Sequence, residues 1–166
     1  MKKAIDTIAN LYSLIALVGL VVLICTMLLE IFMRYFTSSS IIWLHEFLGI
    51  VIIWISFLGF GKIVSDREDI MITYLVNRLT VKNKKKIMFF NTFLQLLSSI
   101  IICYVSAVLT VKGWNRSTLL LEAPYTLYYL PLVMLMLLII LVMIYHIKLL
   151  INDEIDIFIA HGEDTE

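Results

Sequence analysis

Four apolar stretches, each long enough to cross a lipid bilayer, constrain the fold of this chain more than any other feature. A helix needs about 20 residues to span the hydrocarbon core. Residues 11–29, 87–111 and 123–145 carry no charged side chain, and 41–61 carries charge only near its start. The chain is 61% hydrophobic with a mean hydropathy of +0.99, whereas soluble domains are about 45–50% apolar. The sequence therefore predicts an all-α integral membrane protein.

The predicted architecture is a single domain, residues 1–166, with four transmembrane helices. We expect the four spans at about 8–33, 41–64, 87–111 and 123–148. A short amphipathic helix is expected at the membrane interface between the second and third spans, at about 66–81, because its polar side chains form a narrow stripe. The alternative for this segment is a soluble helix that covers the ends of the spans. Residues 152–166 form an acidic tail that we expect to be solvated.

Basic residues are distributed unequally among the connections between these spans. Seven Lys and Arg residues lie from the end of the second span, at Lys62, to the start of the third, at Lys86, against three in the other two connections together. Loops rich in Lys and Arg tend to stay on the cytoplasmic side of a membrane. We therefore expect both termini and the central connection to be cytoplasmic. This topology also explains the basic cluster at 82–86, so no nucleic-acid partner is expected.

The second span has two different faces. Successive residues of a helix are rotated by about 100° around its axis. Placed in this way, one stripe of the span carries mostly aromatic and acidic side chains, and another stripe carries small side chains. The first stripe consists of Trp43, Glu46, Ile50, Trp54 and Phe57. The second consists of Gly49, Ser56 and Gly59. Helices in lipid associate through close approach at small residues, so we expect the second stripe to pack within the chain and the first to contact a partner. The alternatives are an interfacial anchor for Trp43 and a water-exposed carboxylate for Glu46.

Three further residues are expected to have structural roles. Glu30 and Arg34 are spaced i, i+4 and can pair on one helix face. Arg34 is also the nearest plausible partner for Glu46 across the short turn between the first two spans. Pro131 lies about one turn inside the fourth span and is expected to kink that helix.

The sequence does not favour transport or catalysis by this chain alone. Active transporters usually carry ionisable residues deep in the membrane, whereas Glu30, Glu46 and Glu122 lie at one boundary of the spans. No Ser/His, paired-Asp or His-Glu-x-x-His arrangement occurs within a span, so we expect no enzyme and no catalytic residues. Cys25 and Cys103 both lie inside spans, which argues against a thiolate metal site.

The strongest alternative is a haem-carrying anchor subunit of a redox complex. His45 and His146 both lie in spans, and two imidazoles can ligate one haem. The predicted topology, however, separates them by roughly 30 Å along the membrane normal. We therefore expect no cofactor in this chain.

Several short motifs occur in a recognisable order along the chain. They are Arg34-Tyr35, Trp43-Leu44-His45-Glu46, Trp54 with Phe57-Leu58-Gly59, Arg67-Glu68-Asp69-Ile70, Ser117 to Pro124, and Tyr129-Leu130-Pro131. This order resembles the small membrane subunit of tripartite ATP-independent periplasmic (TRAP) transporters. The chain departs from that family at Asp69, where the family often has His, and at Thr73, where an acid is common.

The resemblance implies an accessory subunit of a sodium-coupled symporter for organic acids in a bacterial inner membrane. A separate, large multi-span subunit would carry the substrate and bind sodium. A soluble periplasmic binding protein would deliver the substrate, for example sialic acid or a C4-dicarboxylate. The small subunit would brace the large one and contact membrane lipid, with no cofactor of its own.

Overall fold

The computed structural model describes residues 2–37, 41–66 and 81–151, and these residues form four long helices. The helices are α1 (Lys2–Thr37), α2 (Leu44–Asp66), α4 (Val81–Gly113) and α5 (Thr126–Ile151). Each is long and apolar enough to cross a membrane. The predicted all-helical fold with four membrane-spanning helices is therefore confirmed for the described part of the chain.

Two predicted segments lie outside the described residues. The interfacial helix at about 66–81 falls there except for its two end residues, which are the last residue of α2 and the first of α4. The acidic tail at 152–166 falls there entirely. Both stay predictions.

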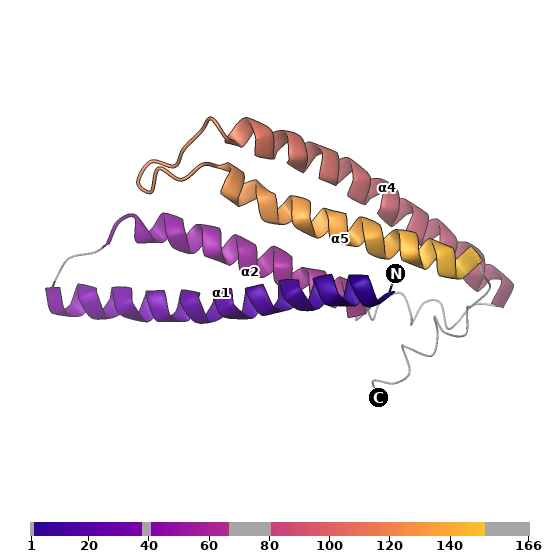
Figure 1. The fold of residues 1–166 in the computed structure, drawn as a ribbon, viewed down its shortest axis with the longest axis horizontal. Coiled ribbons are helices and arrows are strands. Elements are labelled where there is room, and N and C mark those ends of the chain that lie inside the picture. Colours follow the sequence, from indigo (N-terminus) through magenta and orange to yellow (C-terminus); the bar gives the residue numbers. More distant parts are fainter. Residues whose placement is uncertain (1, 38–40, 67–80, 152–166) are drawn as a thin grey trace.

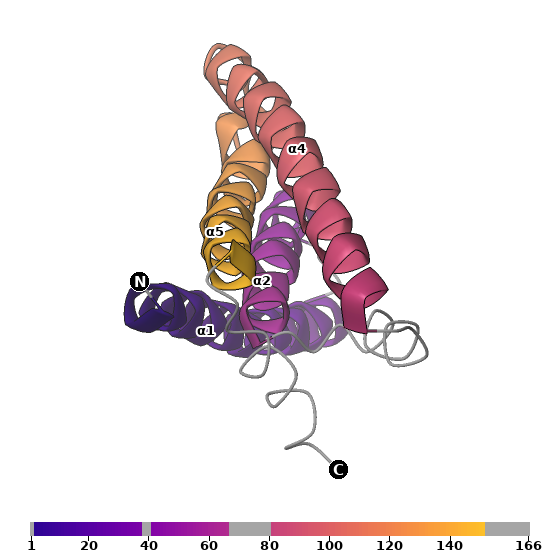
Figure 2. The ribbon, with the colours of Figure 1, turned by 90° about the vertical axis from the view of Figure 1, so that its right-hand side faces the viewer.

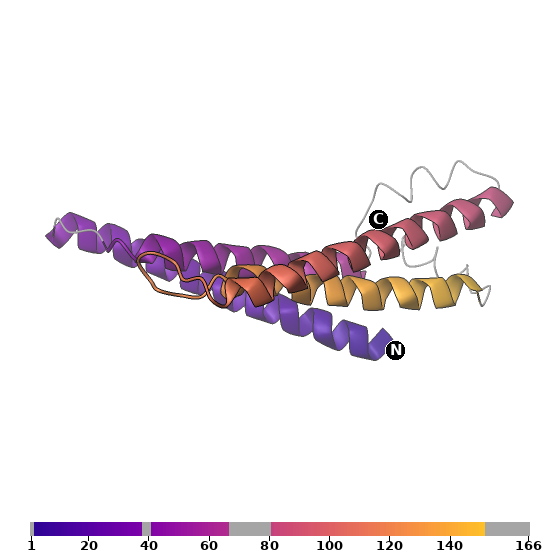
Figure 3. The same ribbon diagram turned by 90° about the horizontal axis from the view of Figure 1, so that it is seen from above.

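The four helices form two antiparallel pairs (Figure 1). α1 packs against α2, α4 packs against α5, and the pairs meet mainly along α2 and α5. The first turns of α1 and α4 lie on opposite sides of α5 (Figure 2, Figure 3). α2 and α5 therefore form the centre of the molecule, and α1 and α4 flank it.

The two ends of the molecule differ in composition. One end holds the last turn of α1, the first turn of α2 and the 114–125 connection, and we call it the hairpin end. The opposite end holds the first turns of α1 and α4 and the last turns of α2 and α5. We call it the basic end, because Lys3, Lys62, Lys86 and Lys148 lie near it.

The side of α1 that packs against the bundle follows a repeat of four and three residues along its length. Its members, none of them exposed, are Ile5, Ala9, Tyr12, Ala16, Gly19, Leu23, Thr26, Glu30 and Met33. This spacing keeps one face of a helix against its neighbour in left-handed packing. Ala and Gly in the repeat allow the close backbone approach that holds helices together in lipid. A Cβ atom on Gly19, for example, would lie only 3.0 Å from Cγ1 of Ile55.

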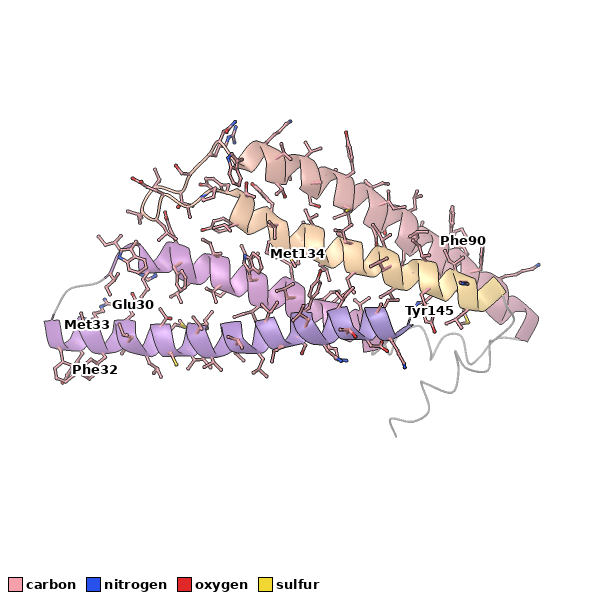
Figure 4. The ribbon with its side chains drawn as sticks, in the orientation of Figure 1. Glu30, Phe32, Met33, Phe90, Met134 and Tyr145 are labelled. Carbon is pink, nitrogen blue, oxygen red and sulfur yellow. The ribbon has the colours of Figure 1, made fainter. Side chains whose placement is uncertain are left out.

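The apolar core lies where α1, α2 and α5 meet, mainly toward the basic end. Its buried members are Ile5, Ala9, Tyr12, Ala16, Leu58, Val64, Leu138, Val142 and Met143. Gly61 lets α2 approach this cluster, since a Cβ there would lie 3.0 Å from Cδ2 of Leu138 and 3.3 Å from Cδ2 of Tyr12. The Tyr12 hydroxyl donates a hydrogen bond to the Met134 carbonyl at 3.4 Å. Met134, labelled on α5 in Figure 4, packs against this cluster.

The end of α4 is fixed to the start of α5. A helix leaves its last four carbonyls without partners inside the helix. The Thr126 hydroxyl donates to one of them, the Thr110 carbonyl, at 2.8 Å. Gly113 permits the close approach, because a Cβ there would lie 3.0 Å from the Thr126 nitrogen. This junction sets where the 114–125 connection can reach.

Candidate functional site

Residues 114–125 form a compact hairpin between α4 and α5. Ser117 and Pro124 pair in an antiparallel bridge. Next to this bridge, the Thr118 amide donates to the Ala123 carbonyl at 2.9 Å, and the Ala123 amide donates to the Thr118 hydroxyl at 3.2 Å. These bonds give hydrogen-bond partners to backbone amide and carbonyl groups of the connection, which need such partners wherever they lie. The hairpin therefore has a defined shape, with residues 119–121 at its tip.

Glu46, in the first turn of α2, holds this tip. Its Oε2 atom accepts hydrogen bonds from the Leu121 amide at 2.8 Å and the Leu120 amide at 3.2 Å, and its Oε1 atom lies 3.3 Å from the Leu120 amide. The Thr118 hydroxyl also bonds the carboxylate. Hydrogen bonds to an ionised group are stronger than neutral ones, and an acid suits the N-terminal turn of a helix. One side chain thus ties α2 to the connection between α4 and α5.

Two further hydrogen bonds join α2 to the first turns of α5. The Tyr128 hydroxyl donates to the Glu46 carbonyl at 3.2 Å, and Nε1 of Trp54 donates to the Leu127 carbonyl at 3.0 Å. In a regular helix the Leu127 carbonyl would accept from the amide of residue 131. That residue is Pro131, which has no amide hydrogen. Trp54 therefore supplies the missing donor.

We call Glu46, Tyr128 and Trp54, together with the groups that they bond, the clamp. All of its members lie on the first three turns of α2, on the hairpin, or on the first turn of α5. The clamp joins the two helix pairs on the hairpin side of the apolar core, and its Trp54 ring packs against that core. We treat it as the candidate functional site, because it sets the shape of the surface at this end.

A separate contact joins α1 to α2 at the same end. Oε1 of Glu30 lies 3.3 Å from Nε2 of His45, with the two side chains 15% and 68% exposed, respectively. Figure 4 shows Glu30 directed from α1 toward the start of α2. The expected pairing of Arg34 with Glu30 or Glu46 is therefore not the arrangement found. Antiparallel packing places His45 opposite Glu30, and the hairpin amides occupy the Glu46 carboxylate.

The stripe predicted to meet a partner makes several contacts inside the chain. Ile50 is buried, Trp54 packs against the core and bonds α5, and Glu46 bonds the hairpin. Trp43 is exposed, and Phe57 is half-buried. The reason is that α2 lies between α1 and α5 and has little free surface. The assignment of these five residues to a partner interface stays a prediction.

The small-residue stripe of α2 does not act as one face. A Cβ on Gly59 would lie 3.8 Å from Cβ of Ala16 on α1, whereas a Cβ on Gly49 would lie 3.9 Å from the Tyr128 hydroxyl on α5. Ser56 is exposed, and its hydroxyl donates to a carbonyl of its own helix at 2.8 Å. The expectation that Ser56 packs within the chain is therefore not met. Position 56 falls on the narrow uncovered side of α2.

The arrangement of histidines does not support a haem site. His45 lies in the first turn of α2, and His146 lies near the end of α5. α2 and α5 run in the same direction, so the two imidazoles are at opposite ends of the bundle (Figure 1). Among the residues that the structure describes, no group of three or more His, Cys, Asp or Glu side chains could hold a metal ion.

Most of the chain matches the model of one protein family. Residues 23–153 match the family described as tripartite ATP-independent periplasmic transporters, DctQ component. The chain belongs to this family. The match confirms the resemblance to TRAP transporter small subunits, and a DctQ component is a transporter component rather than a member of an enzyme class. The matched range includes every residue of the clamp. A comparison with curated proteins found no match.

Parts of the clamp could not be predicted from side-chain patterns. The Leu120 and Leu121 amides are backbone groups, and nothing in the side chains marks them as partners of Glu46. Pro131 does carry a signal, because a proline inside a helix always frees the carbonyl four residues earlier. That signal points to Leu127 as an acceptor in need of a donor. It does not say that the donor is Trp54.

Proposed function

We propose that this DctQ component is the accessory small subunit of a sodium-coupled symporter for organic acids, and that it braces the large transport subunit. In this proposal the large subunit binds sodium and carries the substrate. A periplasmic binding protein delivers the substrate, and C4-dicarboxylates and sialic acid are the candidates. The small subunit needs no cofactor and has no catalytic role.

The family match is the observation that carries the proposal. The flanking helices add support, because α1 and α4 turn long apolar sides away from the bundle. Figure 4 shows Phe90 of α4 directed away from the other helices. Between Asp6 and Glu30, and between Lys86 and Lys112, the sequence has no charged side chain. Such sides suit packing against lipid or another membrane subunit.

Reconstitution in liposomes tests this division of labour. We expect uptake of a radiolabelled organic acid when the chain, the large subunit, the binding protein and an inward sodium gradient are all present. The matched controls omit this chain, omit the large subunit or replace sodium by potassium, and each should abolish uptake. Uptake by the small subunit alone, or full uptake without it, would contradict the proposal. A haem absorption band in the purified chain would contradict the absence of a cofactor.

We also propose that the chain lies in a bacterial inner membrane with the basic end in the cytoplasm. The excess of Lys and Arg at that end supports this orientation. The test uses single cysteines at Ser39, Lys84 and Asn115, in a chain with Cys25→Ser and Cys103→Ser. A membrane-impermeant thiol reagent added to intact cells with a permeabilised outer membrane should label positions 39 and 115 and spare 84. The reverse pattern would contradict the orientation.

A further inference from the structure

The contact between Glu30 and His45 sets the level of α1 relative to α2. Because these side chains lie 3.3 Å apart, Glu30 stands beside the first turn of α2. α2 supplies a candidate span of 22 residues, Leu44–Ser65, and at about 1.5 Å per residue this is about 33 Å. That length matches a hydrocarbon core of about 30 Å. The start of α2, with His45 and Glu46, therefore marks one edge of the hydrocarbon core, where polar side chains belong.

α1 continues beyond this edge. Its candidate span, Lys3–Phe36, has 34 residues, which is longer than any of the other three. Phe36 follows Glu30 by six residues, so it lies about 9 Å farther out along the helix axis. The polar layer on each side of the hydrocarbon core is about 5 to 7 Å thick. Figure 1 shows the end of α1 extending past the start of α2. From Glu30 outward, the last turns of α1 therefore cross the headgroup layer.

The side chains of these last turns have the chemistry of a headgroup site. The rings of Phe32 and Phe36 are 4.3 Å apart, and those of Tyr35 and Phe36 are 5.5 Å apart. All three side chains are exposed: Phe32 by 60%, Phe36 by 66% and Tyr35 by 83%. Figure 4 shows Phe32 directed away from the bundle. Arg34 is exposed in the same turn.

Each component of this cluster fits a phospholipid. Tyrosine has an apolar ring and a polar hydroxyl, a combination that is enriched at membrane interfaces. The planar guanidinium of arginine matches the geometry of phosphate oxygens and can bond two of them at once. The opposite side of the same turns faces α2 through Glu30 and Met33. The three rings are therefore directed away from α2, whereas the exposed Arg34 side chain, four residues after Glu30, lies on the side of α1 nearer to α2.

We propose that the last two turns of α1 form a phospholipid headgroup site, in which the Arg34 guanidinium binds a lipid phosphate and the three rings lie in the headgroup layer. The site fixes the depth of α1 in the membrane. It requires only that the chain spans a bilayer and does not depend on the proposed transport function. The occupant is the lipid surface and not the large subunit.

Depth measurement by spin labelling tests the placement. A nitroxide is attached to Tyr35→Cys, and a control label to Leu28→Cys, which lies on the same exposed face seven residues earlier. Both variants carry Cys25→Ser and Cys103→Ser, and are placed in nanodiscs of phosphatidylethanolamine and phosphatidylglycerol. Relative accessibility to oxygen and to a water-soluble nickel chelate should place position 35 at the phosphate level and position 28 about 10 Å deeper. Any other depth for position 35 would overturn the proposal.

The same labels distinguish lipid from a protein partner. In the complex with the large subunit, oxygen accessibility at position 35 should equal that of the isolated chain. A drop on assembly would show that the large subunit covers the site and would overturn the choice of lipid. The liposome transport assay tests the proposed function separately. A failure of the lipid-site proposal can therefore be distinguished from a failure of the proposed transport function.

Lipid retention tests the role of Arg34. After purification in mild detergent, native mass spectrometry counts the phosphatidylglycerol molecules that remain on each chain. Arg34→Gln should retain fewer lipid molecules than the original chain. Arg34→Lys should retain an intermediate number, because lysine keeps the positive charge but cannot bond two phosphate oxygens with one planar group. Arg116→Gln is the matched control, since Arg116 is exposed at the same end on the other helix pair. Equal retention by Arg34→Gln and the original chain would overturn the phosphate contact.

Discussion

The two ends of the bundle are held together by different interactions. Toward the basic end, apolar and small side chains of α1, α2 and α5 form one buried cluster. Toward the hairpin end, α1 no longer belongs to that cluster, and hydrogen bonds of Glu46, Tyr128 and Trp54 join α2 to the other helix pair. The contact of α1 with α2 there includes the partly exposed pair of Glu30 and His45.

This difference follows from the solvent. Lipid tails are as apolar as leucine, so apolar area alone gives helices little reason to associate. One end therefore relies on close approach, which the small residues on α1 and α2 permit. The other end relies on backbone groups that have no partner in their own segment, namely the hairpin amides and the carbonyl freed by Pro131. The two ends should respond to different substitutions.

The largest effect is expected from Gly61→Leu at the basic end. A Cβ at this position already lies 3.0 Å from Leu138 and 3.3 Å from Tyr12, so a larger side chain must separate α2 from the core. Overpacking of this kind costs about 1–3 kcal/mol, and we expect the upper part of that range. Titration with sodium dodecyl sulfate, followed by near-ultraviolet circular dichroism, measures the free energy of unfolding. Gly49→Ala, with its nearest contact at 3.9 Å, is the control and should change little.

The next effect is expected from Glu46→Ala at the hairpin end. Loss of the carboxylate leaves the Leu120 and Leu121 amides without this acceptor, so the hairpin should open more often. Trypsin cleavage after Arg116 measures that opening, and we expect it to be several-fold faster. Glu122→Asn is the control, because it removes a carboxylate from the hairpin while tolerating the φ of 53° at that position. Unchanged cleavage in Glu46→Ala would show that the clamp does not hold the hairpin.

A double-mutant cycle sharpens the account of Trp54. Trp54→Phe keeps a ring but removes the donor to the Leu127 carbonyl, which should cost about 1 kcal/mol. In a Pro131→Ala background residue 131 has an amide hydrogen again, so the same substitution should cost much less. The detergent titration gives both values. Equal costs in the two backgrounds would contradict the idea that Trp54 replaces the donor missing at Pro131.

The smallest effect is expected from His45→Ala. The imidazole is 68% exposed, and exposed pairs contribute about 0–1 kcal/mol. We expect a loss of about 0.5 kcal/mol or less in the detergent titration. Ser56→Ala, on the uncovered side of α2, should change nothing and is the control. If His45→Ala lowered the free energy of unfolding by more than about 1 kcal/mol, this contact would stabilise the bundle as much as a hydrogen bond of the clamp does.

The sequence predicts the four spans well, because uncharged runs of bilayer length leave few alternatives. It predicts the partners of polar residues poorly. Arg34 is the closest opposite charge to Glu46 along the chain, yet the Glu46 carboxylate bonds amides from residues 74 and 75 positions away. Such partners depend on how the two helix pairs meet. Likewise, the helical wheel of α2 separates two stripes, but it cannot show that α1 and α5 cover both sides of the helix.

Hydrogen–deuterium exchange on the chain in lipid nanodiscs tests most directly the claim that the two ends are held independently. Glu46→Ala should speed exchange in residues 118–123 and leave the first half of α1 as protected as in the original chain. Gly61→Leu should do the opposite, speeding exchange in the first half of α1 and sparing the hairpin. If both variants instead loosen the same residues to the same extent, the bundle is one cooperative unit and the distinction between its two ends is wrong.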